Sequence, residues 1–427
     1  MRTRAIWTLS LLILLLLAGC GNAGPGGSTS SNLPGGGQPT ASQPVLYLVD
    51  NFIDHSGSLV DQVEAFKNGK ELWKYPLPAG AYVNLSGYAL QVTGGVVYAG
   101  VADTLYALDS TTGKLLWKQI AGPAISSILV ANGAVYVDSQ GSQGIIYAFA
   151  VHGGSQQWRY ELPPGVGRPL LVADNNTVYA ADAAYSGVVA LDAHTGSLLW
   201  KNNQDIGDSE DVVALIPVAP SMLLVETSSA LDMLHVTDGG LIWRRVTQSQ
   251  ALEVINGTIC HFFTDVPPLD NPSGQIKSGL RAIAASDNKV LWEVTLPNNF
   301  TQRQLETSTA EALYQIGGPT SGDITAWKIA DGSQIWTTPG GDTYTTLFAD
   351  DHAVYAMSAH GLTAWQALDG KQLWHADTPT DISSLQEVQG SLFGTSQNNN
   401  NVYALNPQNG KLLWTVHVNA IHNLFIA

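Results

Sequence analysis

The side chains best suited to chemistry are few and widely separated in this chain. It holds two cysteines and ten histidines among 427 residues. Cys260 lies in the apolar run 258–263, which favours a buried, unreactive thiol within a strand. The adjacent pair Cys260 and His261 does not have the spacing of a metal site, and two cysteines are too few for a disulfide scaffold. The sequence therefore predicts no catalytic residue.

The densest group of oxygen ligands is the acidic run at residues 205–211. Its carboxylates belong to Asp205, Asp208, Glu210 and Asp211. Hard oxygen ligands of this kind suit Ca²⁺, but the run lacks the regular alternation of a calcium-binding loop. A solvated loop is the favoured interpretation, and a metal site is the weaker alternative.

The other cysteine, Cys20, ends a segment that has the features of an export signal. Arg2 and Arg4 begin it, and residues 6–17 form a leucine-rich run too short for a permanent membrane span. The closing Leu-Ala-Gly-Cys resembles the lipobox of bacterial lipoproteins. That resemblance implies cleavage before Cys20 and attachment of fatty acyl chains, such as palmitate, to its thiol and new amino group. An ordinary signal peptide with an incidental cysteine is the alternative.

The residues after Cys20 have the composition of a flexible tether. Gly, Pro, Ser and Thr make up 17 of the 24 residues from 21 to 44. Such a segment cannot bury enough apolar surface to order itself, and as a random coil it would span about 27 Å. We therefore expect a signal peptide at 1–19, a lipidated cysteine and tether at 20–44, and one folded domain at 45–427.

The charge balance excludes one class of partner. The formal net charge is −16, and only 13% of residues are charged. Nucleic-acid binding requires a basic surface, so the sequence argues against it. An apolar content of 45% also excludes a mainly disordered chain.

A repeat marked by tryptophan fills the rest of the chain. Intervals of 38–49 residues separate nine tryptophans, namely Trp73, Trp117, Trp158, Trp200, Trp243, Trp292, Trp336, Trp374 and Trp414. Four residues before each stands a glycine, or Asn288 in one repeat, and these types tolerate the positive φ of a hairpin turn. Four short strands per repeat predict an all-β fold, a single closed propeller of four-stranded antiparallel blades. We expect each indole to fill a seam between blades.

The repeat resembles the tryptophan-docking motif of the pyrroloquinoline-quinone (PQQ)-like propellers. Residues 107–117 and 190–200 carry its full form, Ala-Leu-Asp-x-x-Thr-Gly-x-x-x-Trp. The family implies eight blades, so we expect eight, with one irregular repeat that does not form a full blade. A strict count of the motifs gives nine, with the last strand, near residues 423–426, pairing with the first blade and removing a sheet edge.

Two branches of that family lead to different functions. Its dehydrogenases bind PQQ and Ca²⁺, and its alcohol dehydrogenases carry a disulfide between adjacent cysteines, a pair that this chain lacks. Lipoproteins similar to BamB, a subunit of the outer-membrane β-barrel assembly machine, are non-catalytic. The lipobox, tether and short repeats favour this second branch.

The resulting hypothesis is a lipid-anchored, extracytoplasmic scaffold with protein partners in the cell envelope and no cofactor. It would lie at the outer membrane of a Gram-negative cell, or on the outer face of a monoderm cytoplasmic membrane. One alternative is a surface sensor or sugar-binding module, in which Trp327 and Trp365 form an aromatic surface and are not core residues. The other is a PQQ- and Ca²⁺-dependent dehydrogenase.

Overall fold

The computed structural model of this chain describes most of its repeat region. It covers residues 44–53, 56, 59–78, 88–139, 144–162, 169–174, 176–182, 185–203, 206, 211–218, 221–247, 250–265, 277–296, 304–317, 322–338, 342–396, 398–419 and 423–427. The chain divides into two units, Met1–Ala41 and Ser42–Ala427, and the second contains every described residue. The predicted signal peptide and nearly all of the tether lie outside the described residues.

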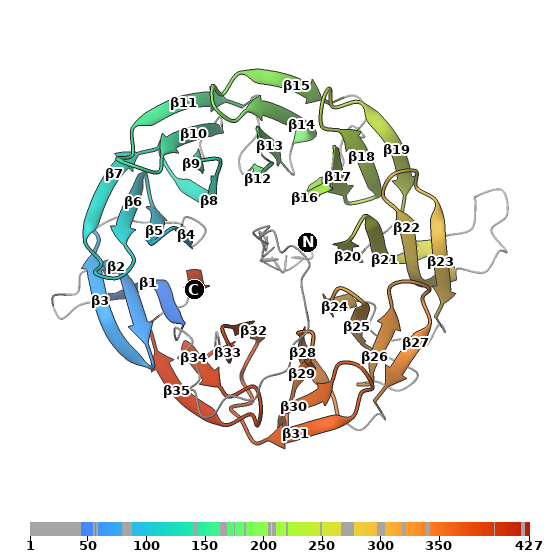
Figure 1. The fold of residues 1–427 in the computed structure, drawn as a ribbon. Helices are drawn as coiled ribbons and strands as arrows, with labels where there is room; N and C mark the ends of the chain where they lie inside the picture. The colour runs from blue at the N-terminus through green and yellow to red at the C-terminus, as the bar shows by residue number, and fades with distance from the viewer. Residues whose placement is uncertain are drawn as a thin grey trace, which may run out of the picture. The chain divides into compact units, whose positions relative to one another are not determined.

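The second unit consists of nine four-stranded antiparallel sheets, the blades of a propeller (Figure 1). The strands of blades 1 to 3 are β36 (Asn423–Ile426), β1 (Val45–Ile53), β2 (Leu59–Lys67) and β3 (Lys70–Pro76); β4 (Tyr88–Thr93), β5 (Val96–Val101), β6 (Thr104–Asp109) and β7 (Leu115–Ile120); and β8 (Ile125–Ala131), β9 (Ala134–Ser139), β10 (Ile145–Ala150) and β11 (Gln156–Glu161). Those of blades 4 to 6 are β12 (Leu170–Ala173), β13 (Thr177–Asp182), β14 (Tyr185–Asp192) and β15 (Leu198–Asn202); β16 (Val212–Val218), β17 (Met222–Thr227), β18 (Ala230–His235) and β19 (Leu241–Val246); and β20 (Gln250–Ile255), β21 (Thr258–Asp265), β22 (Lys277–Ala284) and β23 (Val290–Thr295). Those of blades 7 to 9 are β24 (Gln304–Ser308), β25 (Ala312–Ile316), β26 (Ile324–Lys328) and β27 (Gln334–Thr337); β28 (Tyr344–Ala349), β29 (Ala353–Ser358), β30 (Gly361–Gln366) and β31 (Gln372–Ala376); and β32 (Ser384–Val388), β33 (Ser391–Ser396), β34 (Asn401–Leu405) and β35 (Leu412–His417).

The all-β propeller of four-stranded antiparallel blades is confirmed, but the expectation of eight blades is wrong. The structure has nine, because the first repeat forms a full blade. The sheet order is β3-β2-β1-β36, so the last strand of the chain supplies the fourth strand that the first repeat lacks. Counting the tryptophan motifs is a better guide than the usual blade number of the family.

The third and fourth strands of each blade are joined by a turn that explains the repeated sequence. Ala107 faces Trp117 across the β6–β7 ladder, and the register shifts at the next residue, Leu108. Gly113 closes the turn at φ 68°, a value that L-residues adopt at a cost. Asp109 accepts hydrogen bonds from the Thr112 hydroxyl and from the backbone N–H groups of the turn, which keep the pKa of its carboxyl below its usual value.

The core of the propeller lies in the seams between blades. In the described part of the chain, the buried apolar residues form nine clusters, and each draws its members from two neighbouring blades. One of them contains Leu46 of β1, Ile426 of β36 and Val402 of β34, and so joins blade 9 to blade 1. Stability therefore depends on contacts between consecutive blades.

No helix of the described residues is both long enough and apolar enough to span a membrane.

Candidate functional site

The nine repeat tryptophans lie in the outermost strands and dock against the next blade. Eight of them have an indole N–H that donates to a backbone carbonyl of the following blade at 2.6–3.0 Å. Trp158 is representative, since it donates to Ala193 at 3.0 Å and is 6% exposed. In seven seams a tyrosine or phenylalanine of the same blade packs on the indole at 5.6–6.0 Å between ring centroids. These contacts fix the angle between consecutive blades.

The turn glycines have a second role that their backbone angle does not reveal. A Cβ placed on Gly196 would lie 2.5 Å from Cδ2 of Trp158, inside van der Waals contact. The same close approach repeats around the propeller, where Gly113 meets Trp73 and Gly410 meets Trp374. Each glycine therefore leaves room for the indole of the preceding blade as well as allowing the turn.

One seam uses a different contact. Asn288 replaces the glycine and keeps the positive φ, at 61°. Arg245, two residues after Trp243, donates to the Asn288 side-chain oxygen at 2.5 Å and to its backbone carbonyl at 2.9 Å. Trp243 still donates to Ala285 at 2.8 Å, so a polar contact has replaced part of the glycine packing.

The two ends of the described chain meet in blade 1. Asn419, just before β36, donates to the buried carboxylate of Asp50 through its backbone N–H at 3.0 Å and its side chain at 2.7 Å. Val45 and Ala427 exchange backbone hydrogen bonds at 2.7 and 3.0 Å. These contacts join the last strand to β1 across 369 residues of sequence.

The two rims of the propeller differ in the lengths of their connections. On one rim, the turns between first and second strands have two or three residues, and those between third and fourth strands have five or six except in blade 1. On the other rim, the connections between second and third strands range from two residues after β5 to eleven after β21. The links between blades, on this same rim, range from three residues after β19 to eleven after β3. We call this the variable rim, and it is the candidate binding face.

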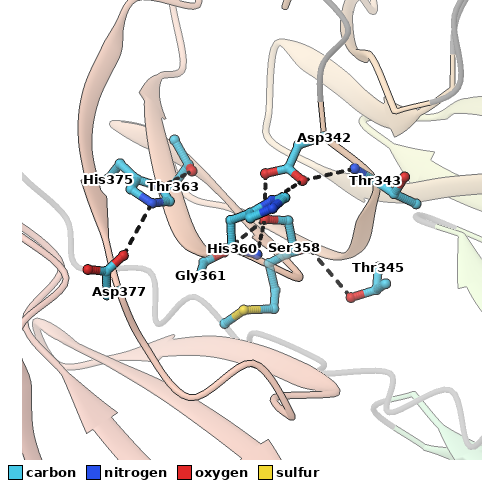
Figure 2. A network of polar contacts seen from close by, with 10 residues as sticks. Asp342, Thr343, Thr345, Ser358, His360, Gly361, Thr363, His375 and Asp377 are labelled. Atoms are coloured by element: carbon cyan, nitrogen blue, oxygen red, sulfur yellow. Dashed lines mark hydrogen bonds and ion pairs between the residues drawn. The ribbon is translucent and has the colours of Figure 1, made fainter.

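A polar network in blade 8 is the best-described part of the variable rim (Figure 2). Asp342 lies in the link before β28, and His360 lies in the turn between β29 and β30. Nδ1 of His360 is 2.8 Å from Oδ1 of Asp342, and Ser358 donates from Oγ to Oδ2 at 2.7 Å. Burial raises the pKa of Asp342, but the Ser358 and His360 contacts outweigh it and hold that pKa below its usual value.

These three residue types are those of a serine hydrolase triad, but their connections differ. In a triad, the imidazole bridges the carboxylate and the serine hydroxyl. Here serine and histidine both contact the carboxylate, and Ser358 is buried. This arrangement joins the Asp342 link to the β29–β30 turn and leaves the His360 ring 73% exposed on the rim.

A second part of the network lies along the last strands of blade 8. His375 contacts the Thr363 hydroxyl through Nδ1 at 2.9 Å, and its Nε2 lies 3.8 Å from Asp377. Asp377 is fully exposed. Blade 8 therefore exposes the His360 imidazole and the Asp377 carboxylate on this rim.

Most of the residues predicted for lipid attachment or metal binding cannot be placed in the structure. Cys20 and three of the four acidic residues, Asp205, Asp208 and Glu210, lie outside the described residues. Asp211 is described and exposed. Among the residues described, no three His, Cys, Asp or Glu side chains form a group that could hold a metal ion.

Cys260 and the two additional tryptophans lie in seams between blades. Cys260 is fully buried, and burial together with nearby Glu253 raises the pKa of its thiol to about 12. Trp327 and Trp365 are 6% and 5% exposed, so they pack in the core and do not form an aromatic surface. Trp327 donates its indole N–H to the Gln315 side chain at 2.9 Å.

Glu226 in β17 makes the stability of the protein depend on pH. Burial raises the pKa of its carboxyl to about 7 from a value of 4.5. The folded chain keeps this proton between pH 4.5 and 7 while the unfolded chain releases it, so stability falls as pH rises through that window. We expect Glu226→Gln to raise the free energy of unfolding at pH 8 by about 3 kcal/mol and to leave it nearly unchanged at pH 4.

Chemical denaturation at both pH values measures this effect. Glu311→Gln is the matched control, because Glu311 is exposed on the other rim and its replacement should have little effect at either pH. Equal effects of Glu226→Gln at pH 4 and pH 8 would contradict the assigned protonation.

A comparison with known protein families identifies the repeat. The family model described as "Outer membrane protein assembly factor BamB" matches residues 56–214, 146–258 and 276–423, which is most of the chain. BamB of Burkholderia pseudomallei is 29% identical over 219 residues, covering 47% of this chain and 54% of the relative. A tetrathionate hydrolase of Acidithiobacillus ferrooxidans is 22% identical over 284 residues, covering 58% of this chain and 56% of the relative. The chain thus spans about half the length of the curated relatives it matches.

Solved structures show the same fold at lower identity. The dihydro-heme d1 dehydrogenase NirN has a TM-score of 0.53 at 10% identity, covering 81% of this chain and 76% of that protein. AztD of Citrobacter koseri has a TM-score of 0.50 at 11% identity, covering 90% and 98%. These likenesses support the propeller fold alone. The docking repeat and the extent of the family match together show that this chain belongs to the PQQ-like β-propeller family of the outer membrane protein assembly factor BamB.

Proposed function

We propose that this protein is a lipid-anchored, extracytoplasmic scaffold that binds protein partners in the cell envelope. The observation that carries the proposal is the contrast between the two rims. Uneven connections on a uniform frame are typical of binding surfaces, because loops can vary without disturbing the packed strands. Membership of the BamB family supports a role in outer-membrane protein assembly.

An affinity capture from native membranes tests the scaffold function. The wild-type chain should retain an envelope protein that His360→Ala with Asp377→Ala weakens, because both side chains are exposed on the variable rim. His352→Ala with Asp351→Ala is the matched control, since this pair lies exposed on the opposite rim of the same blade. Equal loss of the partner in both variants would contradict binding at the variable rim.

The proposed anchor is Cys20, at the end of the lipobox-like segment. Cells grown with a clickable palmitate analogue should label the wild-type protein, and Cys20→Ser should abolish the label because it removes the acylated thiol. Cys260→Ser is the control, since that thiol is buried in a seam and should not affect labelling. Labelling that persists in the Cys20→Ser protein would refute acylation at this residue.

A second candidate function is hydrolysis of a polythionate, supported by the match to a tetrathionate hydrolase over 284 residues. The purified chain incubated with tetrathionate tests it directly. Consumption of tetrathionate above the rate of a heat-denatured control would favour the enzyme over the scaffold.

We also propose that the pairing of β36 with β1 closes the ring in solution, so that every blade packs against another blade on both sides. The nine seam clusters and the Asp50–Asn419 contact support this arrangement. Its test is the strand deletion argued in the Discussion.

A further inference from the structure

The outer hairpins of blades 1 and 2 gather positive charge on an acidic protein. Five of the eleven lysines lie on β2–β3 and β6–β7, and these are Lys67, Lys70, Lys74, Lys114 and Lys118. Lys67 is half-buried and the other four are exposed. The two hairpins also carry four carboxylates, the buried Asp61 and Glu64 together with Glu71 and Asp109, so their formal charge is +1 within a chain of net charge −16.

Among the described contacts, one of the five lysines forms an ion pair with a nearby carboxylate. Glu71 lies 3.3 Å from Lys74 and neutralises that lysine in part. Asp109 accepts hydrogen bonds within its own turn, and Asp103 accepts one from the Thr104 hydroxyl at 2.6 Å. Lys70, Lys114 and Lys118 form no ion pair among the contacts of the described residues.

The two hairpins form one continuous surface. Trp73 of blade 1 packs against Gly113 of blade 2 and donates to Ser110 at 2.9 Å, which brings the two outer strands together. Exposed apolar side chains lie between the lysines, and they are Leu72, Leu115, Leu116 and Ile120. Ile120 is 70% exposed, far more than its chemistry favours. We call these lysines and apolar residues the basic apolar patch.

Tryptophan docking does not explain the patch. The residue before the docked tryptophan is an exposed leucine in several other blades, including Leu199, Leu291 and Leu413. The residue after it is a lysine in blades 1, 2 and 4 and an arginine in blades 3 and 5. The residue after the turn glycine or asparagine is a lysine in blades 1, 2, 6, 8 and 9. Only blades 1 and 2 combine a lysine at both positions, so the paired lysines are a feature of one sector of the propeller.

The position of the patch in the chain points to its occupant. Strand β1 of blade 1 begins at Val45, directly after the proposed tether of residues 21–44. A flexible tether of this length spans about 27 Å, so an anchored chain holds blade 1 near the bilayer and raises the local lipid concentration. Lysines beside exposed apolar side chains are suited to lipid phosphates at the boundary between headgroups and acyl chains.

We propose that the basic apolar patch binds the surface of an anionic membrane and orients the propeller on it. This inference rests on the proposed anchor only for proximity, because the patch itself needs no acyl chain to bind lipid. Membrane contact through the outer edge of two blades would leave the variable rim open to protein partners.

Vesicle sedimentation with a non-acylated chain tests the proposal separately from the anchor. The probe is the mature chain, residues 20–427, carrying Cys20→Ser; it retains the whole compact unit Ser42–Ala427. The vesicles contain phosphatidylcholine alone or with 30% phosphatidylglycerol. The patch variant combines Lys70→Gln, Lys114→Gln and Lys118→Gln. The matched control combines Lys289→Gln, Lys371→Gln and Lys411→Gln, three exposed lysines in the outer hairpins of blades 6, 8 and 9.

The probe should bind the anionic vesicles, and binding should weaken at high salt. Each lysine near an anionic surface contributes about a fivefold increase in partitioning, so the patch variant should bind about 100-fold less tightly. The control variant should change binding by less than about threefold, and circular dichroism should show both variants folded. Equal losses in the two variants, or equal binding to both kinds of vesicle, would overturn the proposal.

A fluorescent thiol label locates the contact. With Cys20 replaced and Cys260 buried, Ile120→Cys and Leu368→Cys each supply one accessible thiol among the described residues. A label at residue 120 should shift its emission to the blue on anionic vesicles, and a label at residue 368 in blade 8 should not. Binding of a polyglutamate peptide to the patch, with no shift at residue 120 on vesicles, would instead assign the patch to an acidic protein partner.

Discussion

Gly196→Ala should destabilise the protein by about 3 kcal/mol, far more than a typical turn substitution. Two costs combine at this position. The residue has a φ of 68°, which costs an L-residue about 1–2 kcal/mol, and its new Cβ would lie 2.5 Å from the Trp158 ring. Overpacking of this kind costs about 1–3 kcal/mol. Denaturant unfolding monitored by circular dichroism measures the sum.

Gly133→Ala separates the two costs. Gly133 also has a positive φ, of 73°, but nothing lies within 4 Å of the position of its Cβ. Gly133→Ala should therefore lower the free energy of unfolding only by the cost of the backbone strain, about 1–2 kcal/mol. If Gly133→Ala and Gly196→Ala have equal effects, the indole contact contributes nothing to the role of the glycine.

Trp158→Ala probes the same seam from the other side. It removes a buried indole and its hydrogen bond to Ala193, which should cost about 3–5 kcal/mol. In a Trp158→Ala background, Gly196→Ala should cost only the backbone strain, because the indole that its new Cβ would meet has been removed. Additive effects of the two substitutions in a double-mutant cycle would show that the residues do not interact.

Deleting residues 423–427 should be the second large effect, because it removes β36. The deletion exposes the edge of β1 and the apolar contacts of Ile426 with blade 9. Burial of an isoleucine contributes about 2 kcal/mol, and the half-buried Leu424 and Phe425 add to it, so the loss should reach about 4 kcal/mol. Hydrogen exchange should accelerate most in β1–β3, since an opened ring unfolds from its free end.

Two controls connect this effect to the strand itself. A peptide of residues 421–427 added in trans should slow exchange in β1 again by restoring the pairing. Asn419→Ala, which removes the side-chain contact with Asp50 and leaves the strand in place, should cost about 1–3 kcal/mol. Unchanged exchange in β1–β3 after the deletion would contradict closure through β36.

The fold could be predicted from the sequence because its main signals are local and repeated. The spacing of the tryptophans, and the glycine four residues before eight of the nine, predict a hairpin without knowledge of the tertiary structure. The expected count of eight was wrong because it followed the usual blade number of the family, whereas the strict count of motifs gave nine. That count already included the pairing of the apolar segment at 423–426 with the first blade, because such pairing removes a sheet edge, and the structure confirms it.

The sequence revealed less about the site, for the same physical reason. The contact of Gly196 with Trp158 crosses a seam, so turn chemistry explains the glycine without revealing its packing role. One signal was available, since eight of nine repeats keep glycine where asparagine would also allow the turn. Asp342, Ser358 and His360 are common residue types on separate segments, and nothing in their spacing predicts the network.

Site-specific photo-cross-linking in living cells tests the central claim, that the variable rim of an envelope-bound propeller binds protein. A benzoylphenylalanine at position 360, whose native histidine is 73% exposed on that rim, should form a covalent adduct with a specific envelope protein. The same probe at position 352, exposed on the opposite rim of blade 8, should not. Adducts of equal yield from positions 360 and 352 would contradict this claim. So would the absence of any adduct both from position 360 and from exposed positions in the other turns of the variable rim.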